Sequence, residues 1–88
     1  MRELMWTEES EDHIGKHLVE PPEVEEVVHA RPRYVARGRG GTELVFGTTA
    51  AGRHLLVVLS DAADGRSYVV TARDMTGAER RAFSARGR

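Results

Sequence analysis

Three apolar runs follow one another at short intervals in the second half of the chain, and this feature constrains the fold most. The loops between them contain Gly52 and Asp64-Gly65, and loops this short join neighbouring strands into antiparallel hairpins. The middle run is continuously apolar from Leu55 to Leu59, as is typical of a central strand with both faces covered. The pattern predicts an antiparallel meander with strands over 43–46, 54–59 and 68–72.

Two helices are predicted before these strands. Thr7 is a good N-cap for a short helix from Thr7 to His17, and acidic residues occupy its first turn, where the helix dipole favours them. Pro21-Pro22 fits the first turn of a second helix, which Pro32 ends. The spacing predicts an apolar stripe of Val24, Val27 and Val28 and a water-facing side of Glu23, Glu25 and Glu26. Trp6, at the entry to the first helix, is expected to pack in the core.

Two further segments complete the predicted domain. Arg33–Arg37 has the pattern of a strand at a sheet edge, and the glycine-rich segment 38–41 is a turn. Thr76 and Glu79 have the spacing of a capping box, which opens a closing helix through about Ala85. Its inner side is predicted to be Ala78, Ala82 and Phe83. We therefore expect a single α+β domain over residues 1–88: two N-terminal helices, a four-stranded antiparallel sheet and a C-terminal helix.

Size and composition narrow the classes of protein further. The chain has 88 residues, which suffice for one simple core, and it lacks cysteine, which removes disulfides and thiolate metal sites. No apolar run approaches the ~20 residues of a membrane span, and the N-terminus is too acidic for a signal peptide. These features predict a cytoplasmic protein that neither contacts a membrane nor needs a cofactor.

The charges are distributed unevenly along the chain. Residues 1–30 have a balance of −7, whereas residues 31–88 contain eleven arginines and have a balance of +6. Guanidinium groups present a planar fork of donors that suits phosphate, and an asymmetry of this kind indicates a nucleic-acid face. The alternative is a soluble surface on which the opposite charges meet in the fold.

One group of possible chemical importance lies near the N-terminus. His13, Lys16 and His17 stand at i, i+3 and i+4 and would share one face of the first helix. Three such groups can bind phosphate, and a histidine can transfer a proton near neutral pH. A solvated helix face is the alternative interpretation.

The same histidines have the helical spacing of metal ligands. His13 and His17 could be joined by His29 or His54 as a third ligand. However, Ile14 follows His13 at the position where the zinc-protease helix carries its glutamate. We therefore predict no metal site.

Three arginines from separate segments form a second group. Arg53 precedes the central strand, Arg73 ends the last strand, and Arg80 lies on the closing helix. A loop, a strand end and a helix can meet at one edge of a small sheet, where three guanidinium groups would clamp a phosphate. Each arginine alone could equally be structural or solvated. The chain has no P-loop and no serine in a nucleophile elbow that would suggest different chemistry.

Five segments between residues 5 and 83 form an ordered pattern that points to a family. They are Met5-Trp6-Thr7; Gly15-Lys16-His17-Leu18-Val19; Glu23–Val28; Phe46–Arg53 followed by 55–59; and Val69–Arg73 with Glu79-Arg80. In order and spacing they resemble the small toxins of the BrnT family, which look like relatives of the RelE-type ribonucleases.

The resemblance implies a ribonuclease toxin of a type II toxin–antitoxin pair, with RNA and a cognate antitoxin as its partners. Such an enzyme cleaves RNA without metal by driving the 2′-hydroxyl onto the adjacent phosphate. The resemblance gives Lys16 and His17 proton transfer and phosphate contact, and gives the three arginines transition-state stabilisation. His13 is added by its position as a substrate-binding residue.

The chain departs from the family pattern at two informative positions. Leu18 stands where a glycine is expected after the histidine, and Phe83 replaces a tyrosine near the end of the closing helix. A catalytically silent module of the same fold, binding nucleic acid or protein, is therefore the alternative function. A third hypothesis is a structural protein whose charge asymmetry drives the formation of homo-oligomers.

Overall fold

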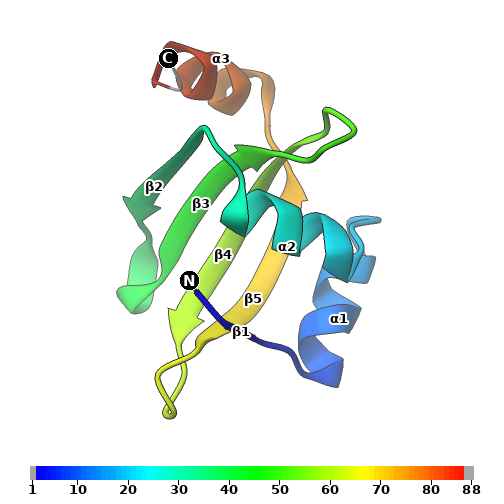
Figure 1. The fold of residues 1–88 in the computed structure, drawn as a ribbon, viewed down its shortest axis with the longest axis vertical. Helices are drawn as coiled ribbons and strands as arrows, with labels where there is room; N and C mark the ends of the chain where they lie inside the picture. Colours follow the sequence, from blue (N-terminus) through cyan, green and yellow to red (C-terminus); the bar gives the residue numbers. More distant parts are fainter. Residues whose placement is uncertain (1, 87–88) are drawn as a thin grey trace.

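A five-stranded mixed sheet is the centre of the fold in the computed structural model, which describes residues 2–86 (Figure 1). The elements are β1 (Leu4–Met5), α1 (Glu8–Gly15), α2 (Pro21–His29), β2 (Arg33–Arg37), a 3-10 turn (Arg39–Gly41), β3 (Glu43–Thr48), β4 (His54–Asp61), β5 (Ser67–Asp74) and α3 (Gly77–Arg86). In space the strands are ordered β1-β5-β4-β3-β2. The predicted α+β class is confirmed.

The predicted four-stranded antiparallel sheet was incomplete because it lacked β1. The four longer strands are antiparallel as expected, but β1 adds to β5 in parallel, pairing Leu4 with Ser67 and Met5 with Tyr68. The amide of Ser67 also donates to the carbonyl of Glu3 at 3.0 Å. A strand of two residues is too short to show the alternation by which strands are recognised in a sequence.

The main core lies between the sheet and the two N-terminal helices. Val24, Val27 and Val28 of α2 are buried as predicted, and they meet the inward side chains of β3, β4 and β5. Figure 1 shows α2 lying across the sheet. The close approach requires Gly47 on β3, since a Cβ there would lie 3.1 Å from Cγ1 and 3.3 Å from the carbonyl oxygen of Val27. Trp6 is half-buried and packs against this core.

The glutamates of α2 do more than face water. Glu25 accepts a hydrogen bond from the indole Nε1 of Trp6 at 3.0 Å, and Glu26 accepts one from the amide of Ala50 at 3.1 Å. These side chains therefore help to fix the N-terminal segment and the β3–β4 loop to α2.

The closing helix α3 lies at one end of the sheet, apart from α1 and α2 (Figure 1). Its predicted capping box is present: the amide of Glu79 donates to Oγ1 of Thr76, and the amide of Thr76 donates to Oε1 of Glu79. Phe83 is buried, but Ala78 and Ala82 are exposed, so the predicted inner side was too broad. With one apolar anchor, α3 covers only a small part of the sheet. Within residues 2–86, the helices are all too short or too polar to traverse a bilayer.

Candidate functional site

The turn between α1 and α2 places His17 at one end of the sheet. The predicted helix to His17 was two residues too long, because α1 ends at Gly15 with Lys16 as its C-cap. His17 therefore lies in the turn, and the predicted common helical face with His13 and Lys16 does not form. His13 and Lys16 instead line a shallow hollow on the outer side of α1.

Leu18 explains why the helix ends where it does. Its φ of +58° lies in the left-handed region, and the following amide, that of Val19, donates back to the carbonyl of Ile14 at 3.0 Å. This conformation favours glycine and costs a leucine about 1 kcal/mol. Leu18 is also 82% exposed. Leu18 thus adopts a backbone geometry for which a glycine is better suited.

Arg53 joins this turn to the sheet. Its Nε and Nη2 donate to the two carboxylate oxygens of Asp74 at 2.8 and 3.1 Å. Nη1 donates to Oε1 of Glu23 at 3.0 Å, and two further bonds go to backbone carbonyls, those of Leu18 at 2.8 Å and His17 at 3.2 Å. A guanidinium has five N–H donors, so all of them are used within the protein. Arg53 therefore positions the turn and has no donor left for a phosphate.

The pKa values at this pair agree with the geometry. The hydrogen bond to Asp74 raises the pKa of Arg53 above its usual range. In return, the hydrogen bond from Arg53 lowers the pKa of Asp74, and the charge of His17 makes a smaller contribution in the same direction.

Arg73 does not meet Arg53. Asp74 is paired with Leu55 and so lies on the sheet face covered by α1 and α2, whereas Arg73 is paired with Leu56 on the other face. Nη1 and Nη2 of Arg73 donate to the two carboxylate oxygens of Glu79 at 2.8 and 2.9 Å. This hydrogen bonding lowers the pKa of Glu79 to about 2. Arg73 therefore fixes the start of α3.

Arg80 and His54 lie beside Arg53. A hollow of about 270 Å³ is lined by Gly52, Arg53, His54, Asp74, Met75 and Arg80. Arg80 is exposed, and within residues 2–86 it has no carboxylate at ion-pair distance. The ring of His54 stands edge-on to Phe83, with 6.1 Å between the centroids. Phe83 thus supports a histidine next to the guanidinium of Arg80.

The structure therefore brings together only part of the predicted site. Arg53, Arg80 and the backbone of His17 meet at one end of the sheet, while His13, Lys16 and Arg73 lie outside this hollow. The sequence reasoning considered His54 only as a metal ligand. Its position directly after Arg53, at the start of the central strand, was the available signal.

Two further findings bear on this end of the molecule. Among residues 2–86, the His, Asp and Glu side chains do not form a group of three or more that could hold a metal ion. No family model, curated protein or solved structure matches the chain.

Proposed function

We propose that this chain is a metal-independent endoribonuclease with a RelE-like fold, the toxin of a type II toxin–antitoxin pair. The observation that carries the proposal is the hollow where Arg80 and His54 lie beside the Arg53–Asp74 pair, next to the turn that holds His17. Arg80, which has no carboxylate partner within residues 2–86, supplies a phosphate ligand, and the imidazole of His54 beside it supplies a general base for RNA cleavage.

The reaction follows from the chemistry of these groups. The imidazole of His54 takes the proton of the ribose 2′-hydroxyl, and O2′ forms a bond to phosphorus. The bond between phosphorus and O5′ breaks, and a water molecule gives a proton to the leaving O5′. The products are a 2′,3′-cyclic phosphate and a 5′-hydroxyl. Arg80 offsets the negative charge that develops on the phosphoryl oxygens.

The remaining predicted residues take supporting roles in this proposal. Arg53 and Arg73 are positioning residues, because their donors are bonded to carboxylates and carbonyls of the protein. Lys16 and His13 lie on the outer side of α1 beside the carboxylates of Glu9, Glu11 and Asp12, and His17 lies in the turn that Arg53 holds, so these three residues take no part in the chemical step.

The silent binding module is the second candidate, and one observation favours it. Two of the three arginines expected to clamp a phosphate are bonded within the protein. On this interpretation Arg80 and the histidines bind RNA without cleaving it, and Leu18 and Phe83 are the departures responsible.

The decisive test is cleavage of a fluorescent RNA oligonucleotide by the purified protein in the presence of EDTA, with the termini identified by mass spectrometry. We expect 2′,3′-cyclic phosphate ends. Arg80→Ala should lower the rate by roughly 10²-fold, and His54→Ala by roughly 10²- to 10⁴-fold. Arg66→Ala, at the opposite end of the sheet, is the matched control.

The outcomes separate the two candidates. Full activity in folded Arg80→Ala and His54→Ala proteins would place the site elsewhere. RNA binding without cleavage by the wild type would establish the silent module. Induced expression in a bacterial host adds the biological test, since a toxin arrests growth and the Arg80→Ala variant at the same protein level should not.

A further inference from the structure

The free edge of the sheet at β2 carries a second cluster of arginines. β2 is paired only with β3, so the backbone groups along its outer side are not used by the sheet. Arg33, Val35 and Arg37 are exposed, whereas Tyr34 and Ala36 between them are half-buried. An exposed strand edge is a template on which another extended chain can pair.

The charges along this edge have a single sign. Arg31, Arg33, Arg37 and Arg39 are all exposed, and residues 31–39 contain no acidic residue. In the described part of the chain, the guanidinium groups of these four arginines make no ion pair. Natural sheets often place charges on an edge to prevent unwanted pairing, but like charges on one face of the edge strand, here Arg33 and Arg37 on either side of Val35, also select a partner strand of opposite charge.

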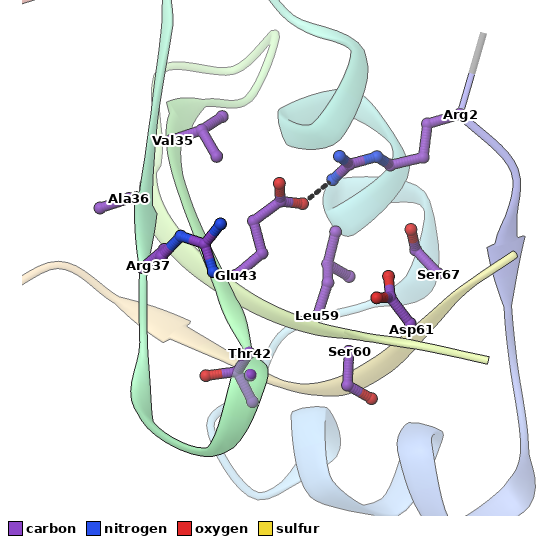
Figure 2. A pocket seen from close by; sticks show the side chains of 11 residues that line it. Arg2, Val35, Ala36, Arg37, Thr42, Glu43, Leu59, Ser60, Asp61 and Ser67 are labelled. Atoms are coloured by element: carbon purple, nitrogen blue, oxygen red, sulfur yellow. Dashed lines mark ion pairs between the residues drawn. The ribbon is translucent and has the colours of Figure 1, made fainter. Parts of the chain in front are cut away.

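A hollow of about 380 Å³ opens beside this edge. Figure 2 shows Val35 pointing into the hollow and Ala36 pointing away from it. Arg2 and Glu43 form an ion pair at its rim, and Leu59 lies at its base (Figure 2). Val35 is 42% exposed. The hollow can therefore accept a side chain from a strand that pairs with β2.

Pairing between two copies of β2 is disfavoured by these charges. An antiparallel pair centred on Val35 would set Arg33 of each copy opposite Arg37 of the other, and like charges in that position are destabilising. RNA matches the edge less well than a peptide does, since phosphates accept hydrogen bonds from strand amides but leave the strand carbonyls without donors.

We propose that β2 is the docking edge for an extended, acidic segment of a partner protein, which adds to the sheet as a sixth strand. Acidic side chains at positions i and i+4 of the segment face Arg33 and Arg37, and a small apolar side chain at i+2, on the same face, fills the hollow beside Val35. The proposal goes beyond RNA cleavage and does not depend on it, because this edge contains none of the residues of the candidate site.

A synthetic peptide with glutamate at positions i and i+4, valine at i+2 and threonine at the two positions between them is the probe. We expect it to bind the full-length protein, to slow the hydrogen exchange of the β2 amides, and to bind more weakly as salt is added. The same peptide with lysine in place of both glutamates should not bind. Arg33→Glu with Arg37→Glu should weaken binding of the acidic peptide about tenfold.

The matched control reverses two arginines elsewhere: Arg66→Glu with Arg81→Glu should leave peptide binding unchanged. The proposal is overturned if the acidic peptide does not bind, if it binds the two double variants equally, or if it protects amides outside β2. Protection of β2 by RNA in place of peptide, or by self-association seen in sedimentation, would equally overturn it. The salt titration of the wild type provides a test that needs no variant.

Discussion

The two arginine-rich regions of this protein differ in what surrounds them. At the end of the sheet where β5 stops, Arg53 and Arg73 each bind a carboxylate through two nitrogens and also donate to backbone carbonyls. At the β2 edge, Arg33 and Arg37 stand exposed without a carboxylate partner in the described part of the chain. One residue type thus serves two purposes in this protein: an arginine bonded to a carboxylate builds the site, and an exposed arginine without a carboxylate partner in the described part of the chain offers a binding surface.

The largest effect is expected when the Arg53 network is removed. Arg53→Ala leaves Asp74, Glu23 and the carbonyls of the α1–α2 turn without their common donor, so the free energy of unfolding should fall by about 2–3 kcal/mol. Urea denaturation measures this loss. Arg53→Lys should recover little, because an ammonium cannot form the two-nitrogen pair with Asp74.

Arg81→Ala is the control for this comparison, since Arg81 is exposed on α3 and should change stability by less than ~0.5 kcal/mol. A loss equally small for Arg53→Ala would mean that its hydrogen bonds add nothing net to folding. Arg53 and Arg73 would then be as available for a ligand as Arg33 and Arg37 of β2.

Local signals predicted the fold better than they predicted the site. Thr7, Pro21 and the Thr76–Glu79 capping box marked helix starts that the structure contains, because caps act within one turn. β1 was missed because its pairing with β5 is non-local and only two residues long.

The site was harder to predict because each arginine's partner is distant in sequence or lies on a face fixed by register. Nothing around Arg53 in the sequence shows that Glu23 and Asp74 would occupy its donors. Arg73 and Asp74 are neighbours in the chain, yet strand alternation sends them to opposite faces. His54 needed the three-dimensional structure to appear beside Arg80.

The second effect concerns the Arg73–Glu79 pair and depends on pH. The pKa of Glu79 is lowered from 4.5 to about 2 in the folded state, chiefly by the hydrogen bond from Arg73. The folded state therefore resists protonation, so the contribution of Glu79 is complete above pH 4.5 and is lost as the pH falls through about 2. Glu79→Gln, which keeps a capping side chain, should cost about 1–2 kcal/mol at neutral pH.

Urea denaturation of wild type and Glu79→Gln over a series of pH values checks this prediction. The difference between the two proteins should shrink as the solution is acidified from pH 4.5 and should be lost near pH 2. A difference that stays constant over this range would show that the charge of Glu79 is not what stabilises the start of α3.

A smaller effect of opposite sign is expected at Leu18. Leu18→Gly relieves the left-handed backbone at φ +58°, so the protein should become more stable by about 0.5–1 kcal/mol despite the greater freedom of glycine in the unfolded chain. Leu18→Ala is the control, because it removes the exposed side chain but keeps the strain. An equal gain from both substitutions would assign the effect to the side chain and not to the backbone.

The smallest effect on stability is expected at the β2 edge, where it tests directly whether Arg33 and Arg37 differ from Arg53 in their contribution to folding. Arg33→Ala with Arg37→Ala removes two exposed guanidinium groups that have no carboxylate partner within residues 2–86, so each should change the free energy of unfolding by less than ~0.5 kcal/mol. Thermal and urea denaturation beside Arg53→Ala measure this. A loss above about 1 kcal/mol would mean that the edge arginines support the fold through contacts to backbone, such as the one from Arg33 to the carbonyl of Ala30. Arg33 and Arg37 would then support the fold as Arg53 and Arg73 do, and would not be a surface kept for a binding partner.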